Sequence, residues 1–457
     1  MRRVLAAVAA AFVGLGIGAG ALWWALTPAP YVNPPLTPLA ERADAGEAPN
    51  VVLIIGCTVR RDQLTPYGGP ETVTPFLAKL ASEGAKFEDV IAASSWTKAS
   101  SVALLTGRHA ISVGMVEPKR VRNERALHPS ITTLAEYFVD AGYETMGVTG
   151  NPNLNSDFGL AQGFDAYRDV DGRIIEVKLS GQDLVDRALQ LVDERAAPDR
   201  PLFLQAMLVD AHEPRDNLSD DEREAFKTDG VSSELAEYRG QLHRIDLALA
   251  TLEEGLKSRG IAPENTLWVM VADHGEGLDM PQHHRGHGRT LYPSMVEVPW
   301  IVRGPGVTAG TQVQGLASLI DLSRTVTALA GIQGPAHGED WSGQVGGATP
   351  WTTRYLAFSD TWFYETRRSS AWTSSEACQK DFGSTGEGRD DIVFEDGCFD
   401  RREDVGFSTP LPPTRLMTEL EGWRAARVEE ASTFNLSSDA TVSGQLSEHL
   451  EALGYVD

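Results

Sequence analysis

The chain has 457 residues, of which 42% are hydrophobic, so it can bury a large core and has room for two or three domains. Its formal net charge of −24 argues against nucleic acid or an anionic membrane surface as a binding partner, and an anionic substrate would need local positive charge or a metal ion. Alternating strand-like and helix-like runs favour an α/β fold over an all-α or all-β fold.

The amino terminus carries an apolar segment. Arg2 and Arg3 precede a nearly uncharged run at residues 4–26, and a membrane-spanning helix needs about 20 such residues. The leading arginines, and Trp23 with Trp24 near the far end, fit a helix that starts in the cytoplasm. A cleaved signal peptide is the alternative, but no small-x-small cleavage site follows the run, which favours a retained signal anchor. Either way, the rest of the chain is expected outside the cytoplasm, in the periplasm or cell envelope if the source is bacterial.

Beyond this segment, residues 28–49 are rich in Pro, Ala and charge and predict a linker. Short apolar runs then predict buried strands at residues 50–56, 144–149, 202–208, 267–271 and 296–302. Periodicity or capping residues predict helices at residues 74–84, 95–107, 130–142, 235–256 and 319–330. The pattern weakens after about residue 350, which indicates a smaller carboxyl-terminal subdomain.

Reactive side chains follow several of these strands. They are Cys57, Asn151, His212, and the pair Asp273 and His274. The carboxyl ends of strands in open α/β sheets form the usual ligand site, so we expect these side chains to meet at one edge. His287 follows in the next loop, and Thr97 lies at the start of a predicted helix.

This set of residue types suits metal-assisted displacement at an oxyanion ester. Asp273 with His274 is a borderline ligand pair for Zn or Mn. A metal ion would activate the Thr97 hydroxyl, the free N–H groups of the helix start would bind anionic oxygens, and Lys98 and Arg289 would add positive charge. The simpler alternative makes Thr97 an ordinary helix cap and Asp273 a capping carboxylate.

Three cysteines are present. In an oxidising compartment Cys378 and Cys398 could form a disulfide, which would leave Cys57 as the odd one. A single buried cysteine is usually inert packing.

Several stretches together resemble one family. The chain resembles the sulfatases, members of the alkaline-phosphatase-like superfamily of metal-dependent sulfate and phosphate ester hydrolases. The stretches that carry the resemblance are residues 50–62, 96–107, 273–276, 286–292, 298–306 and 450–457. The resemblance implies a sandwich in which helices flank a large, mostly parallel sheet, with a smaller carboxyl-terminal α+β subdomain. The expected domains are a signal anchor or signal peptide (1–27), a linker (28–49), a catalytic domain (50–350) and a subdomain (351–457).

Two motifs depart from the family pattern. True sulfatases carry Cys or Ser in a Cys-x-Pro-x-Arg frame and convert it to formylglycine, whereas this chain has Thr97, Ala99 and Ser101 there. Threonine instead resembles the nucleophile of related phosphodiesterases. Cys57 stands where the family has a metal-binding Asp, and a thiolate favours Zn over Ca as the divalent metal.

The resemblance implies a hydrolase of a sulfate or phosphate ester that is carried by a small molecule or a glycan, and the amino-terminal segment predicts that it acts outside the cytoplasm. Thr97 would be the nucleophile, with His212 and His287 contacting the ester oxygens or leaving group. Cys57, Asp273 and His274 would bind the metal, and Lys98, Asn151 and Arg289 would bind substrate. The alternative is a membrane-tethered pseudoenzyme that binds a ligand without turnover. A lipid-headgroup transferase of the same superfamily fits less well, because such enzymes have several membrane spans and this chain has one predicted span. No oligomeric state is predicted.

Overall fold

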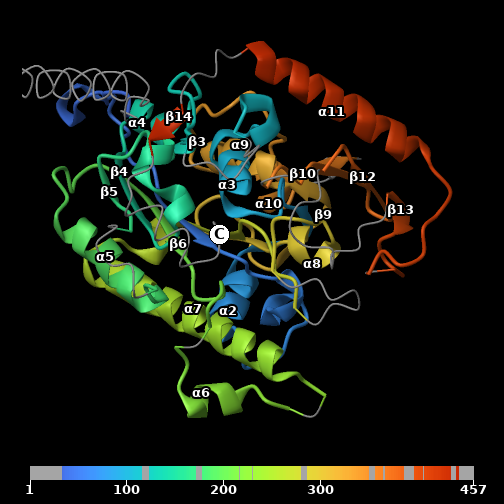
Figure 1. Ribbon diagram of the computed structural model, residues 1–457. Coiled ribbons are helices and arrows are strands. Elements are labelled where there is room, and N and C mark those ends of the chain that lie inside the picture. The colour runs from blue at the N-terminus through green and yellow to red at the C-terminus, as the bar shows by residue number, and fades with distance from the viewer. Residues whose placement is uncertain are drawn as a thin grey trace, which may run out of the picture.

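An eight-stranded sheet forms the centre of the molecule, in the order β5–β4–β6–β1–β7–β8–β2–β9 (Figure 1). The computed structural model describes residues 33–441 apart from 116–122, 171–177, 216, 229, 279–285, 349–355, 364–365, 385–395, 405 and 434–438. The strands of this sheet are β1 (Asn50–Gly56), β2 (Ala85–Ile91), β4 (Glu144–Thr149), β5 (Ala166–Arg168), β6 (Leu202–Leu208), β7 (Thr266–Ala272), β8 (Trp300–Arg303) and β9 (Thr311–Ser318).

The register of the sheet brings the strand ends together. β1 pairs in parallel with β6 and β7, and Gly56 lies opposite both Leu208 and Ala272. β4 pairs in parallel with β6, so its last residue, Thr149, lies beside Met207. β8 is antiparallel to both β7 and β2, so β2 again runs in the direction of β7. The chain therefore leaves all five strands β1, β2, β4, β6 and β7 at the same edge.

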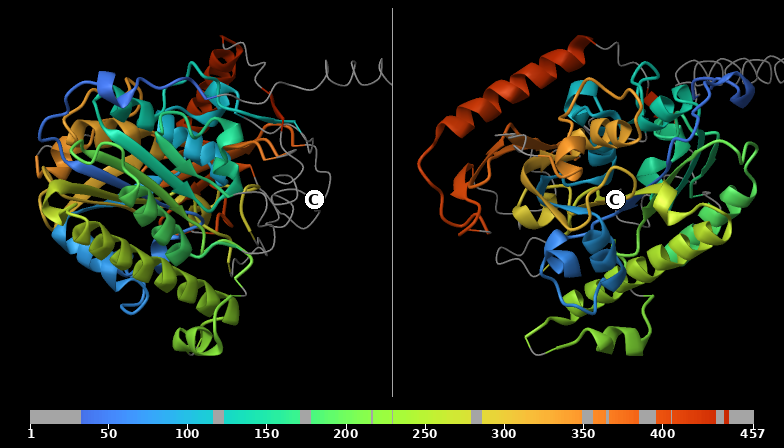
Figure 2. Two further views of the ribbon diagram at one scale, coloured as in Figure 1. Left: turned by 90° about the vertical axis from the view of Figure 1, so that its left-hand side faces the viewer. Right: turned by 180° about the vertical axis from the view of Figure 1, so that it is seen from behind.

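Helices cover both faces of this sheet (Figure 2, left). One face carries α2 (Pro75–Glu83), α5 (Gly181–Asp193) and α7 (Ser233–Ser258), with α6 (Asp220–Ala225) beside α7. The other carries α3 (Thr97–Thr106), α4 (Leu134–Asp140), α9 (Leu322–Leu329) and α10 (Ser342–Val345). The short α8 (Pro293–Val296) precedes β8. Because helices bury it on both faces, β1 is apolar at almost every position, as in other parallel sheets.

A second, antiparallel sheet follows, made of β10 (Ala357–Thr361), β11 (Arg368–Trp372), β12 (Glu376–Asp381) and β13 (Gly397–Asp400). The long helix α11 (Arg415–Thr433) lies along it (Figure 1). The predicted disulfide between Cys378 and Cys398 is confirmed and joins opposed residues of β12 and β13. A short pair, β3 (Asn123–Arg125) and β14 (Asp439–Thr441), completes the described strands. The predicted fold class, a large mostly parallel sheet flanked by helices with a smaller carboxyl-terminal α+β part, is confirmed.

Two predicted boundaries are wrong. The helix predicted at 130–142 begins only at Leu134, because Thr133 and Glu136 form a capping box at its start. The strand predicted at 296–302 begins only at Trp300, after Val296 closes α8. β2 and β9 were not predicted, since charged and polar side chains break their apolar runs.

The predicted amino-terminal span and the family-like stretch at 450–457 lie outside the described residues. None of the helices in the described ranges has the length and apolar character needed to cross a bilayer. The end of the predicted linker lies against the body: Arg42 is 7% exposed and pairs with Asp165, donating also to the carbonyl of Tyr143. The division of the chain into domains stays a prediction.

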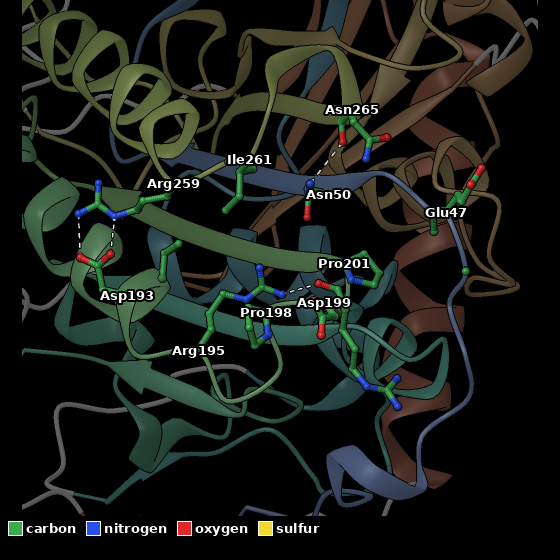
Figure 3. A pocket seen from close by; sticks show the side chains of 15 residues that line it. Glu47, Asn50, Asp193, Arg195, Pro198, Asp199, Pro201, Arg259, Ile261 and Asn265 are labelled. Carbon is green, nitrogen blue, oxygen red and sulfur yellow. Dashed lines mark hydrogen bonds and ion pairs between the residues drawn. The ribbon is translucent and has the colours of Figure 1, made fainter.

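A hollow of about 850 Å³ lies where β1, β6 and β7 begin (Figure 3). Asn50, Arg195, Arg259 and Asn265 are among the residues that line it. Its arginines are already engaged, Arg195 with Glu144 at 2.8 Å and Arg259 with Asp193 at 2.8 Å. Because these strands end at the opposite edge of the sheet, the hollow is separate from the predicted reactive residues.

Candidate active site

The end of β1 places a buried thiol beside the predicted nucleophile. Cys57 is fully buried, and its Sγ lies 3.6 Å from Thr97 Oγ1. Asn151, which follows β4, donates from Nδ2 to Cys57 Sγ at 3.2 Å and to Thr97 Oγ1 at 3.4 Å. The next residue, Thr58, has φ +59°, a left-handed conformation that costs a β-branched residue about 1–3 kcal/mol. Its N–H donates to Asp273 Oδ1 at 3.1 Å, which compensates for part of this strain and fixes the turn after Cys57.

Thr97 is the first residue of α3 and is fully buried. Its Oγ1 lies 3.2 Å from His274 Nε2, and the N–H groups and positive dipole of the helix start are available to an anion there. Four further buried polar atoms in this stretch form no hydrogen bond within the described part of the chain: the hydroxyls of Ser94, Ser95 and Ser101 and the indole N–H of Trp96. Buried polar groups are normally paired, so this environment is suited to a polar ligand or to water.

Asp273 and His274 follow β7. His274 Nδ1 lies 2.8 Å from the carbonyl of Gly275, so Nδ1 donates its proton there and the lone pair of Nε2 faces Thr97. Burial lowers the pKa of His274, while Asp273 acts in the opposite direction. Asp273 Oδ1 accepts from the N–H of His274 at 2.7 Å, whereas its Oδ2 is buried and accepts no hydrogen bond from any described group. Gly275 is required at the turn, since a Cβ there would lie 2.0 Å from the carbonyl oxygen of Ser294.

These side chains form a set of metal-ligating groups. One ligand atom each from Cys57, Asp273 and His274 lies within 4.8 Å of the others, and all three residues are buried. The buried Asp273 Oδ2, with no hydrogen bond from the described residues, supplies the kind of donor that a cation would use. Sulfur, carboxylate oxygen and imidazole nitrogen are all ligands of divalent metals, with Thr97 Oγ1 adjacent as a further oxygen. The residues present therefore fit a divalent cation.

Two more histidines lie against this set. The ring centroid of His287 is 4.6 Å from that of His274 and 4.9 Å from that of His212. Each has its Nδ1 held, His212 by the carbonyl of Glu213 and His287 by Glu276 Oε1 at 3.2 Å. Burial and then His287 lower the pKa of His212 well below its usual value. Burial also acts to lower the pKa of His287, but Glu276 outweighs it and the pKa is raised.

Sequence reasoning assigned no role to the buried ion pair behind these histidines. Arg215 Nη2 lies 3.2 Å from Glu276 Oε2, and the two side chains are 5% and 1% exposed. Burial acts to raise the pKa of Glu276, but the charges of His287 and Arg215 lower it to about 2. Glu276 belongs to the family-like motif at 273–276, so the sequence could have predicted its place near the site. No sequence motif marks Arg215.

The remaining predicted substrate contacts are placed differently. Lys98 is 1% exposed, and its Nζ lies over the ring of Phe158, 3.8 Å from the centroid. Arg289 is half-buried in the loop after His287, and its carbonyl accepts from Arg368 Nη1 at 2.6 Å. The structure thus gathers Cys57, Thr97, Asn151, His212, Asp273, His274 and His287 into one site, with Lys98 adjacent to Thr97 in the chain.

Similar proteins are known for most of the length of this chain. A family model described as Sulfatase matches residues 49–332, more than half of the chain. Arylsulfatase G of Mus musculus is 26% identical over 374 residues, which cover 65% of this chain and 69% of that protein. The ulvan-active sulfatase of Formosa agariphila is 23% identical over 343 residues, covering 66% of each chain.

Solved structures share the fold. BT4656, in complex with its substrate D-glucosamine-2-N,6-O-disulfate, matches with a TM-score of 0.66 and 15% identity, over 85% of this chain and 99% of that one. The phosphonate monoester hydrolase of Agrobacterium radiobacter matches with a TM-score of 0.61 and 17% identity, over 84% of this chain and 96% of that one. These matches confirm the alkaline-phosphatase-like fold predicted from the sequence.

Proposed function

This chain belongs to the sulfatase family, and from that premise we propose that it hydrolyses a sulfate or phosphate ester with Thr97 as the nucleophile. One observation carries the proposal: a buried hydroxyl at a helix start lies 3.2 Å from His274 Nε2 and 3.6 Å from Cys57 Sγ. This arrangement brings the hydroxyl, the metal-ligating groups and an anion-binding helix end together, as ester hydrolysis requires. Thr97 would act through its own hydroxyl, without conversion to formylglycine.

The reaction proceeds in two displacements. Thr97 Oγ1 gives up its proton and forms a bond to the sulfur or phosphorus, the ester bond to the leaving oxygen breaks, and the leaving alcohol takes up a proton in return. Water then loses a proton as it attacks the sulfur or phosphorus of the threonine ester. The bond to Thr97 Oγ1 breaks, Oγ1 takes up a proton to restore the hydroxyl, and sulfate or phosphate is released. His212 and His287 have Nδ1 held by other groups, so Nε2 of each is the nitrogen that would contact the ester oxygens or the leaving group.

Cys57, Asp273 and His274 are proposed to hold a divalent metal, which would neutralise negative charge and lower the pKa of the Thr97 hydroxyl. The set contains one carboxylate and one sulfur. Calcium takes about 6–8 oxygen ligands, whereas zinc binds about four ligands drawn from sulfur, nitrogen and oxygen. We therefore favour zinc over calcium for this chain.

Substrate contacts are proposed for Asn151, Lys98 and Arg289. Asn151 Nδ2 already donates to both Cys57 and Thr97, so it can reach an oxygen of the ester bound there. The names of the relatives and neighbours support a sulfated glycan or a small ester as the substrate class. The apolar run at residues 4–26 supports an extracytoplasmic protein that is anchored through one helix or secreted.

A second candidate function is a pseudoenzyme that binds such a ligand without turnover. Cys57 is the observation that favours it, because this thiol replaces a carboxylate that the family uses for its metal. Loss of the metal would leave the helix end and the histidines able to bind an anion but not to activate Thr97.

The test compares the purified protein with Cys57→Ala and Thr97→Ala variants. Metal content is measured by mass spectrometry after loading with zinc or calcium. Turnover is measured with an aryl sulfate, an aryl phosphate and a phosphodiester as substrates. We expect one zinc per chain that is lost in Cys57→Ala, and turnover that falls at least about 1,000-fold in Thr97→Ala. If the protein binds no metal and shows no turnover, the hydrolase proposal is wrong and the pseudoenzyme remains. If Thr97→Ala keeps full activity, Thr97 is not the nucleophile.

A further inference from the structure

A cluster of cations and aromatic rings lies beside the site, where the smaller sheet meets the main body. Trp362 follows β10, Arg367 precedes β11, and Arg424 comes from α11, which lies along this sheet (Figures 1 and 2). The Cζ atoms of Arg367 and Arg424 are 5.6 Å and 5.0 Å from the centroid of the Trp362 ring. Arg424 also lies 4.1 Å from the ring of Phe382. Two guanidinium groups thus converge on one indole.

The two carboxyl groups near these arginines neutralise little of their charge. Asp381 pairs with Arg368 at 3.1 Å and accepts from two backbone N–H groups. Asp360 is 1% exposed, and its burial raises its pKa to about 7, which reduces its charge. Burial lowers the pKa of Arg424, with Asp360 and Asp381 acting to raise it and Arg367 to lower it. The described part of the cluster therefore carries excess positive charge, in a chain with a net charge of −24.

Arg424 Nε donates to Ser369 Oγ at 3.2 Å, but two other donors of the cluster have no acceptor among the described residues. Trp362 Nε1 and Arg367 Nε are buried from water, and neither meets an acceptor among the described residues. A buried donor without a partner is unfavourable, so an acceptor at this position would be bound favourably. An oxyanion provides several acceptor oxygens and also the opposite charge, which arginine recognises best.

The cluster is joined to the catalytic residues through a short path. Phe363, next to Trp362, packs on Trp96 with ring centroids 5.3 Å apart, and Trp96 precedes the nucleophile Thr97. Phe363 also fits against Gly288, where a Cβ would lie 2.9 Å from the ring, and Thr361 Oγ1 donates to the carbonyl of Gly288. The loop after β10 thus lies against both the nucleophile segment and the His287 loop.

We propose that Trp362, Arg367 and Arg424 form a subsite for a second anionic group, a sulfate or carboxylate, on a sugar ring next to the ester that Thr97 attacks. This inference rests on the proposed function and narrows the substrate to a glycan with at least two negative groups. The guanidinium groups bind the oxyanion, and Trp362 supplies the indole N–H and holds both arginines in place.

The experiment measures binding without turnover. Calorimetry on the Thr97→Ala protein compares a disulfated disaccharide with its monosulfated analogue, before and after adding Arg367→Gln or Arg424→Gln. We expect the disulfated probe to bind at least about tenfold tighter, because its second sulfate accepts charge-assisted hydrogen bonds from the two arginines. Either glutamine should bring the ratio close to one, and Arg424→Lys should keep part of it.

The matched control is Arg415→Gln, which removes an arginine that is also on α11 but is 90% exposed. It should leave the ratio unchanged. A ratio near one in the starting protein, or an equal loss with Arg415→Gln, would overturn the subsite. If Arg424→Gln lowers the melting temperature, Arg367→Gln, which lies outside the helices, decides the test. If the protein prefers the disulfated probe but hydrolyses none of the test esters, the subsite is retained and the hydrolase proposal is overturned. If it hydrolyses an ester but does not prefer the disulfated probe, the hydrolase is retained and the subsite is overturned.

Discussion

Replacement of Arg215 by methionine should destabilise the protein through a buried charge that it leaves behind. The guanidinium makes two ion pairs of unequal exposure. Glu213, at 3.1 Å, is 54% exposed, and such a surface pair contributes about 0–1 kcal/mol. Glu276, at 3.2 Å, is 1% exposed, and loss of one partner of a buried pair costs about 3–5 kcal/mol. The buried partner therefore decides the outcome.

Two other contacts adjust the estimate. His287 remains 3.2 Å from Glu276 and continues to neutralise part of its charge, which moves the cost toward the lower end of that range. Nε of Arg215 also donates to the carbonyl of Ala211 at 2.9 Å, and loss of this bond adds about 1 kcal/mol. We expect the Arg215→Met variant to lose about 3–4 kcal/mol of unfolding free energy.

The assay is equilibrium unfolding in urea, followed by tryptophan fluorescence. Glu213→Gln serves as the control for the exposed pair and should change stability by less than about 1 kcal/mol. Adding Glu276→Gln to Arg215→Met removes the uncompensated charge and should restore at least about 1 kcal/mol, a measurable coupling. If Arg215→Met costs no more than Glu213→Gln, the buried pair does not stabilise the site and this reasoning is wrong.

Three further predictions concern the scaffold. Because burial raises the pKa of Asp360 to about 7 from 3.8, its contribution to stability is complete below pH 3.8 and is lost as the pH rises through 7. Asp360→Asn should therefore narrow the difference in stability between pH 5 and pH 8 by about 2–3 kcal/mol, and an unchanged difference would contradict the raised pKa. Gly275→Ala places a Cβ 2.0 Å from the carbonyl oxygen of Ser294 and should lower the melting temperature markedly. Gly422→Ala, in helix α11 with no atom within 4 Å of the added Cβ, should instead stabilise the protein by about 0.5–1 kcal/mol. Equal changes in melting temperature for the two variants would refute the steric argument. Cys398→Ala removes a disulfide between residues 20 apart in sequence and should lower the unfolding free energy by about 3 kcal/mol when no reductant is present. Added reductant should remove the difference between the variant and the parent protein, because it breaks the disulfide of the parent.

Local sequence determined much of the central sheet. The runs at 50–56, 144–149 and 202–208 coincide with β1, β4 and β6, which are buried between neighbouring strands and covering helices. Burial on both faces makes β1 and β6 apolar at almost every position, whereas β4 also contains Glu144, Thr145 and Thr149. Strand ends were informative for the same reason: a reactive residue directly after a buried strand must lie at the edge where parallel strands finish. Local pattern alone is therefore enough to identify Cys57, Asp273 and His274 as candidates, and the predicted helix start adds Thr97.

Strands with mixed patterns were not identified. β2 carries Lys86, Glu88 and Asp89 within seven residues, and it is a strand because β8 and β9 pair with it on its two sides. These pairings join residues far apart in the chain, and no local period records them. The smaller carboxyl-terminal part was predicted, but its strands were not placed, since they are short and their apolar positions are completed by α11.

The sequence by itself determined the family, the reactive residue types and their places at strand ends, because these depend on local pattern and on motifs. Only the tertiary structure decided that Arg215 neutralises Glu276 and that Arg367 and Arg424 meet on Trp362. Each of those pairs joins separate segments, and Arg424 comes from a helix 57 residues after Arg367 in the numbering. Charge pairing of this kind depends on distance in space and on exclusion of water, and neither quantity is written in the order of residues.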